Sequence, residues 1–254
     1  MLYSIIIAYL GYGSTSGNCQ KITVFCHQLN THTMRFVIMG DSWALGNWDG
    51  DQGIVEYLRA DQHQVRVMAE PGSSNINQVR HLREQIRKGE ITPDQQIIWI
   101  VTDPLRDHTN EARGRRVQTL SEYHMEREQL LRQRFREIQD LPVWLVGGVC
   151  ALPEWVAHEF PRFRVICADW VRWLTKQPVP MGICRLYRYG DCDAELSRLF
   201  HEQEREMDRF RHRAEHDPHS GEHLWFWPDG EHPNRVAHRL LYDGVLKPAM
   251  AVDK

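Results

Sequence analysis

An apolar run that stops abruptly at a Gly-Asp-Ser sequence is the feature that most constrains this chain. Phe36 to Met39 form the run, and Gly40, Asp41 and Ser42 follow it directly. A short apolar run ended by turn-forming residues is typical of a buried parallel strand. Such a strand carries Ser42 at its carboxyl end, which is the edge where open α/β sheets bind ligands.

The rest of the chain alternates between strand-like and helix-like patterns. We expect strands at 65–68, 97–101, 141–149 and 164–167, and helices at 54–58, 76–87 and 120–138. Strands separated by helices predict βαβ units, right-handed crossovers and a mostly parallel sheet. A length of 254 residues with 42% hydrophobic content suits one substantial core.

A serine hydroxyl is a poor nucleophile until a base takes its proton. Near the C-terminus, Asp229 and His232 lie three residues apart in a turn-rich segment, just before a helix expected near Pro233. Both side chains can therefore face one site. We expect His232 to be the base and Asp229 the group that orients it.

These two blocks, Gly40-Asp41-Ser42 and Asp229-Gly230-Glu231-His232, resemble those of the SGNH hydrolases, also called GDSL-type esterases and lipases. The resemblance extends from Met34 to the C-terminus and depends on ordered blocks that are individually short. It implies a flavodoxin-like, three-layer α/β sandwich with a mostly parallel five-stranded sheet. It also implies ester hydrolysis by a Ser-His-Asp triad, as in an esterase, a lipase or a carbohydrate O-deacetylase, without a cofactor.

The same family has two blocks that bind the oxyanion of the reaction. Gly72-Ser73-Ser74-Asn75 is similar to the first, and the resemblance assigns the backbone N–H groups of Ser42 and Gly72 as oxyanion donors. The second block is altered, because Asp103 follows the strand at 97–101 where the family has an asparagine.

An ionised aspartate only accepts hydrogen bonds, so Asp103 would repel an oxyanion. Three alternatives follow: Asp103 stays protonated, the Thr102 hydroxyl or the Asn75 amide donates instead, or the protein is slow or inactive. In the last case it would be a glycan- or lipid-binding module. Thr102-Asp103-Pro104 also suits a simple turn that opens a helix.

Each catalytic block has a plainer structural interpretation. A Gly-Asp-Ser sequence is often only a turn, and Asp229-Gly230 can cap the helix expected near Pro233. The tryptophans near the blocks are similarly ambiguous, since they can stack on sugars or fill the core. They are Trp43, Trp48, Trp99, Trp225 and Trp227.

Charge and hydropathy limit the partners. The formal net charge of −3, from 31 basic and 34 acidic residues, creates no field that favours nucleic acid or an anionic membrane. The apolar run from Ile5 to Leu10 is too short to span a bilayer and no basic residues precede it, so neither a signal peptide nor an anchor is predicted. We expect a cytoplasmic protein whose substrate is a small-molecule or glycan ester.

Residues 1–33 are predicted to be an N-terminal extension, and residues 34–254 the hydrolase-like domain. Gly11, Gly13 and Gly17 lack the spacing of a nucleotide-binding loop, and Met34 is a plausible functional start. A helical insertion is expected at 191–221, with a helix from Ala194 to Ala214. Its apolar stripe predicts packing against the domain, with a lid or a dimer contact as alternatives.

Histidines and cysteines are the residues of this chain that suit a metal or redox site. His212 and His216 have helical spacing, but Asp217-Pro218 interrupts the helix and no His-Glu-x-x-His sequence is present, so no metal is expected. The six cysteines form no Cys-x-x-Cys pair. Cys150 and Cys167 follow apolar strands and are predicted to be buried thiols.

Overall fold

The computed structural model describes residues 33–46, 53–107, 119–148, 150–175 and 232–252, together with 194–195, 197–198, 201–202 and 205. These residues belong to one compact unit, Thr33–Lys254. The expected extension lies outside the described residues except for Thr33, as does most of the expected insertion. Both boundaries therefore stay predictions.

Five parallel strands form the central sheet in the order β2-β1-β3-β4-β5. The strands are β1 (Arg35–Met39), β2 (Gln64–Val67), β3 (Gln95–Val101), β4 (Val143–Gly147) and β5 (Phe163–Cys167). This is the flavodoxin-like order, in which the ligand-binding switch point lies between β1 and β3. The predicted fold class, an α/β sandwich on a parallel five-stranded sheet, is confirmed.

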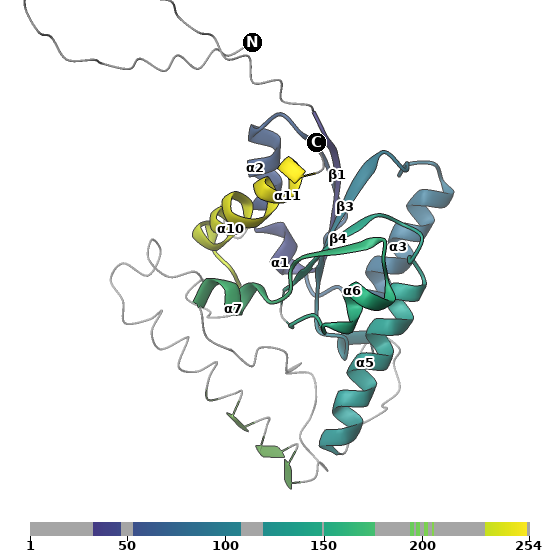
Figure 1. Cartoon of the computed structure of the whole chain (residues 1–254), viewed down its shortest axis with the longest axis vertical. Coiled ribbons are helices and arrows are strands. Elements are labelled where there is room, and N and C mark those ends of the chain that lie inside the picture. Colours follow the sequence, from purple (N-terminus) through teal and green to yellow (C-terminus); the bar gives the residue numbers. More distant parts are fainter. Residues whose placement is uncertain are drawn as a thin grey trace, which may run out of the picture. The chain divides into compact units, whose positions relative to one another are not determined.

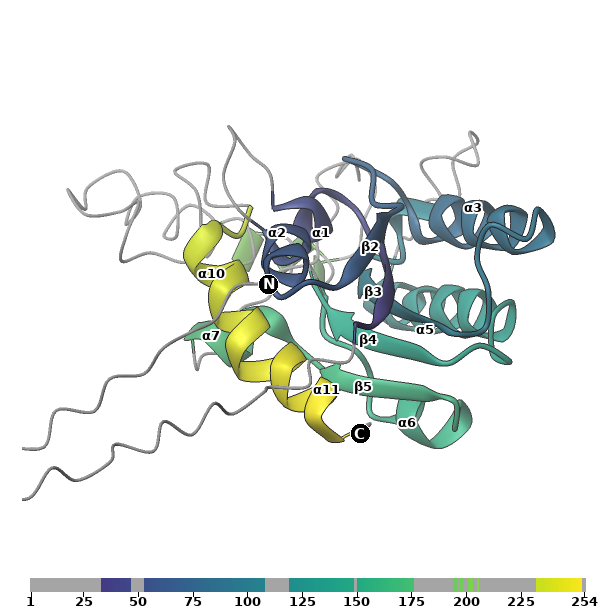
Figure 2. The ribbon, with the colours of Figure 1, turned by 90° about the horizontal axis from the view of Figure 1, so that it is seen from above.

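Helices cover both faces of the sheet (Figure 2). One face carries α3 (Asn75–Arg87), α5 (Leu120–Arg136) and α6 (Trp155–Glu159). The other carries α1 (Ser42–Leu45), α2 (Ile54–Ala60), α7 (Trp170–Thr175), α10 (Arg235–Leu241), the π-helix η1 (Tyr242–Leu246) and α11 (Lys247–Val252). In the part of the chain that is described, no helix combines the length and the apolar character needed to cross a membrane.

Successive strand residues point into two separate cores. Val37 and Trp99 face the core under α3, α5 and α6, whereas Ile38 and Ile98 face the core under the remaining helices. A strand covered on both faces needs apolar residues at every position rather than at alternate ones. This requirement explains why the continuous runs ending at Met39 and Val101 predicted buried strands correctly.

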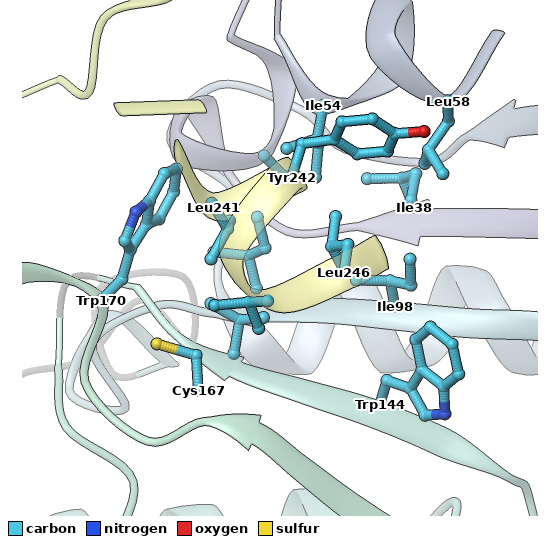
Figure 3. Close-up of a cluster of buried hydrophobic side chains, with 14 of the residues drawn as sticks. Ile38, Ile54, Leu58, Ile98, Trp144, Cys167, Trp170, Leu241, Tyr242 and Leu246 are labelled. Carbon is cyan, nitrogen blue, oxygen red and sulfur yellow. The ribbon is translucent and has the colours of Figure 1, made fainter. Parts of the chain in front are cut away.

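The C-terminal helical run fills the second core (Figures 1 and 3). Leu241, Tyr242 and Leu246 lie over the strand side chains Ile38 and Ile98 (Figure 3). The Tyr242 hydroxyl donates to the Asp61 carboxylate over 2.6 Å, and its ring stacks on Tyr57 with 5.8 Å between centroids. These contacts fix α10, which begins just after His232.

The sequence predicted the beginning of this C-terminal run but not its length. Only a helix beginning near Pro233 was expected, whereas helical structure continues to Val252 and includes the π-helix η1. Within η1, a Cβ on Gly244 would lie 2.8 Å from the Trp173 ring. The bare glycine therefore allows the run to approach α7. The helices α6 and α7 were also missed, because each is too short to show a period.

His238 is buried in α10 without polar partners. Its side chain is fully buried, and neither ring nitrogen has a hydrogen-bond partner among the described residues. The Trp170 ring packs edge-on against it at 5.0 Å, and a Cβ on Gly46 would meet its Nε2 at 2.9 Å. Burial lowers the pKa of His238 to about 3, so the ring is neutral in the folded protein.

This burial predicts acid-sensitive stability. The unfolded chain protonates His238 below about pH 6.5, whereas the folded chain resists protonation down to about pH 3, so stability is full above pH 6.5 and is lost as the pH falls. Between pH 7 and pH 5 we expect this histidine alone to remove roughly 2 kcal/mol from the free energy of unfolding. His238→Leu should abolish that component in urea denaturation.

The exposed His158 provides the matched control. His158→Leu should keep the full pH dependence of the parent protein. If His238→Leu loses stability between pH 7 and pH 5 as steeply as the parent, His238 does not cause the acid sensitivity.

Candidate functional site

The chain leaves β1 through a glycine that no other residue can replace. Gly40 has a φ of 153°, and a Cβ at this position would lie 2.7 Å from the Ala44 Cβ and 2.9 Å from the Ile100 carbonyl oxygen. Any side chain would therefore separate α1 from β3. The missing Cβ allows Ser42 to follow the strand closely, at the sheet edge between β1 and β3.

Asp41 organises this edge through its carboxylate, which is fully buried. One oxygen, Oδ1, accepts the Trp43 N–H over 2.9 Å and so caps α1, whose first residue is Ser42. The other, Oδ2, accepts the Thr102 hydroxyl over 2.6 Å and the Arg106 guanidinium over 3.0 Å. Asp41 thus joins the ends of β1 and β3. The predicted turn is a single turn of helix rather than a loop.

His232 lies against Ser42 although 190 positions separate them in the sequence. The distance between its Nε2 and the Ser42 Oγ is 2.9 Å, a hydrogen-bond distance. Asn234, two residues later, caps α10 by accepting the N–H groups of Val236 and Ala237. The start of α10 is also held by α2, because the Tyr57 hydroxyl donates to the Arg235 carbonyl over 3.1 Å.

Several expected site residues lie outside the described part of the chain. Asp229 is among them, and its assignment as the orienting group stays a prediction. Trp48, Trp225, Trp227 and the histidines from His212 to His223 also lie outside it. Of the remaining tryptophans considered for sugar stacking, Trp43 and Trp99 are buried in the two cores.

Gly72 occupies a turn beside the Ser42 turn. The loop after β2 runs along the end of β1, since the Glu70 N–H donates to the Gly40 carbonyl over 3.2 Å. Ser73 N–H then donates back to the Glu70 carbonyl, and Gly72 has a φ of 70°. With proline at position 71, this is a type II turn. Among the described residues, neither the Ser42 N–H nor the Gly72 N–H donates a hydrogen bond.

Asn75, considered as an oxyanion donor, instead joins α3 to β3. Its side chain is fully buried, and its Nδ2 donates to the Thr102 carbonyl over 2.9 Å. Its Oδ1 accepts the Thr102 N–H over 3.2 Å. The stretch Gly72–Asn75, which resembles the first oxyanion block, runs into a helix, because Asn75 is already the first residue of α3. We therefore leave Asn75 out of the oxyanion site proposed below.

Asp103 forms the turn that its sequence context allowed. Its carboxylate accepts the Leu105 N–H over 3.0 Å, its carbonyl accepts the Arg106 N–H over 3.1 Å, and it is 1% exposed. This is a turn that opens a helix, as the alternative interpretation stated. The carboxylate is already bound within its own turn, so we also leave Asp103 out of the proposed oxyanion site.

Arg127, a half-buried residue of α5, provides positive charge near Asp103. Burial by itself lowers the pKa of Arg127, but the Asp103 carboxylate together with the Tyr123 and Cys150 side chains outweighs that effect and raises the pKa above its usual range. The guanidinium also donates to the Tyr123 hydroxyl over 3.0 Å. Burial raises the pKa of both Tyr123 and Cys150 to about 12. Neither group is therefore ionised near neutral pH.

The predicted buried thiols are confirmed, since Cys150 and Cys167 are both buried. No group of three His, Cys, Asp or Glu side chains able to hold a metal ion occurs among the described residues. What the sequence analysis missed is the polar framework of Asp41, Thr102 and Arg106. The only feature of the sequence that could have indicated this framework was Arg106, which lies three residues after Asp103 in the turn expected there.

The Asp103 turn predicts different stabilities for two substitutions. Asp103→Asn keeps a side-chain oxygen for the Leu105 N–H, whereas Asp103→Ala does not, and both remove the charge near Arg127. The alanine variant should be less stable than the asparagine variant by about 1 kcal/mol, the usual value of a side-chain cap. Urea denaturation of the two proteins measures the difference. Equal stabilities would contradict the capping role.

Comparison with known proteins finds likenesses among solved structures. No protein-family model matches the chain, and no curated protein matches it. Among solved structures, a lipase/acylhydrolase from Enterococcus faecalis matches with 15% identity and a TM-score of 0.34. The match covers 82% of this chain and 91% of that one. A likeness at this level supports no conclusion on fold or activity, so both depend on the geometry of the chain itself.

Proposed function

We propose that the protein is a serine hydrolase that cleaves ester bonds, with Ser42 as the nucleophile and His232 as its base. The observation that carries this proposal is the 2.9 Å contact between the His232 Nε2 and the Ser42 Oγ. A nucleophile and a base within hydrogen-bond distance are the first requirement of this chemistry. The location, at the carboxyl edge between β1 and β3, is where this sheet topology favours a ligand.

In the first half of the reaction, His232 accepts the Ser42 proton while the Oγ attacks the ester carbonyl. The tetrahedral intermediate then collapses, and His232 returns the proton to the departing alcohol. An acyl-serine remains. In the second half, His232 takes a proton from water, the resulting hydroxide attacks the acyl group, and the proton returns to Ser42 as the acid leaves. Asp229 is proposed to hold the imidazole in the required tautomer.

The negative oxygen that forms in both halves requires donors that are already in place. We assign the backbone N–H groups of Ser42 and Gly72 to this role. Two facts support the assignment: the Gly40–Glu70 hydrogen bond joins the two turns, and neither N–H is engaged within the described residues. With backbone donors, the oxyanion site does not need the side-chain amide of an asparagine at position 103, where this chain has an aspartate.

The proposed substrate is a small-molecule or glycan ester. Because Trp43 and Trp99 are core residues, neither supports sugar stacking at the site. The alternative function, a glycan- or lipid-binding module without catalysis, was suggested by Asp103. That suggestion is weakened because the Asp103 carboxylate is bound within its own turn.

An active-site probe tests the proposal directly. A fluorophosphonate labels only an activated serine, so the parent protein should be labelled and Ser42→Ala should not. His232→Gln should slow labelling and p-nitrophenyl acetate hydrolysis by roughly 10⁴-fold, because an amide cannot accept the serine proton.

Ser121, an exposed serine in the first turn of α5, provides the control. Ser121→Ala should be labelled like the parent. A parent protein that the probe does not label, but that binds acetylated oligosaccharides, would refute the hydrolase and favour the binding module. A panel of p-nitrophenyl esters beside acetylated sugars would then define the substrate class of an active protein.

A further inference from the structure

Arg106 reaches the residue beside the proposed nucleophile. Its Nη1 donates to the Asp41 Oδ2 over 3.0 Å, and its side chain is 25% exposed. The arginine thus lies at the same sheet edge as Ser42, partly open to solvent. None of the blocks that suggested a hydrolase includes it.

The turn after β3 presents this arginine. The Asp103 carboxylate caps the turn, the Arg106 N–H donates to the Asp103 carbonyl, and the Asp107 N–H donates to the Pro104 carbonyl. Asp107 anchors the end of the turn, because its buried carboxylate accepts the Ile76 N–H over 2.9 Å and the Arg134 Nε over 3.1 Å. A turn held at both ends keeps the Arg106 side chain directed at β1.

The Asp41 carboxylate requires such a partner. It is fully buried, and a buried carboxylate is costly unless hydrogen bonds and a cation compensate it. It also lies one residue from Ser42, where the reaction develops negative charge on the substrate oxygen. An uncompensated carboxylate at this point would oppose that charge over a short distance in a medium of low dielectric constant.

We propose that Arg106 is a positioning residue for the reaction and that it acts through Asp41. It balances the charge of the Asp41 carboxylate and holds that carboxylate against the Trp43 N–H, so that Asp41 continues to cap α1. In this way Arg106 keeps the Ser42 N–H and Oγ in place and keeps the oxyanion site free of an unbalanced negative neighbour. The inference depends on the proposed hydrolase function, and it adds the Arg106 guanidinium to the groups that support the nucleophile. The role of Asp103 in this proposal is structural, since its carboxylate caps the turn that carries Arg106.

Three variants test the proposal by the kcat and KM of p-nitrophenyl acetate hydrolysis. Arg106→Met removes the charge and keeps an apolar stem, so kcat should fall about tenfold to a hundredfold with KM within about threefold of the parent. Arg106→Lys keeps the charge and should restore kcat to within about threefold of the parent. Arg83→Met, in an exposed ion pair with Glu137, is the matched control and should change neither constant.

The double variant Asp41→Asn with Arg106→Met separates an effect through Asp41 from a loss of packing. An asparagine can still accept the Trp43 N–H and can donate to Thr102, so both charges vanish while the cap remains. We expect its kcat to equal that of Asp41→Asn alone to within about threefold, because non-additivity of this kind marks two residues that act together. This comparison holds even if Arg106→Met does not fold.

The outcomes discriminate between the two proposals. A parent protein with neither turnover nor fluorophosphonate labelling overturns both. An active parent whose Arg106→Met variant keeps its kcat overturns only the role of Arg106. A raised KM with unchanged kcat would place Arg106 on the bound substrate instead. If the double variant has a kcat tenfold lower than that of Asp41→Asn alone, Arg106 does not act through Asp41.

Discussion

The buried carboxylate of Asp41 is the interaction on which the candidate site depends. It accepts hydrogen bonds from Trp43, Thr102 and Arg106, and these donors come from two segments of the chain, α1 and the stretch that follows β3. A carboxylate with no exposed surface tolerates few other arrangements, since each lost donor would leave a buried charge less compensated. Its demand for donors therefore fixes the ends of β1 and β3 relative to each other, and Ser42 with them.

The parallel sheet makes this convergence possible. The carboxyl ends of β1, β2 and β3 meet at one edge because all the strands run in one direction, and the pairing aligns Ile38 with both Val67 and Ile98. His232 arrives at the same edge from the far end of the sequence. It does so because the C-terminal run packs into the second core, where Leu241 and Leu246 are fully buried. The position of His232 in the site thus depends on the packing of core residues that lie at some distance from the site.

Much of this fold could be predicted because the signals were local. The run from Phe36 to Met39 predicts a strand since both of its faces are buried, and Gly40 marks the strand's end because no Cβ fits there. The framework of Asp41, Thr102 and Arg106 gave no comparable signal. Its bonds depend on the register between β1 and β3, which apolar runs do not specify when every position is buried. The short α7 and the π-helix depend on tertiary contacts as well.

Asp103 illustrates why a departure from a family pattern needs geometry before it is interpreted. Compared with a block that carries asparagine, the aspartate looks like an electrostatic defect. In the structure, the carboxylates of Asp41 and Asp103 each have a guanidinium nearby: Asp41 has Arg106, and Asp103 has Arg127. An asparagine at position 103 would keep the cap but leave Arg127 without the carboxylate that balances it. The aspartate therefore fits the local charges of this chain, and the oxyanion role that we propose falls to backbone N–H groups rather than to a side-chain amide.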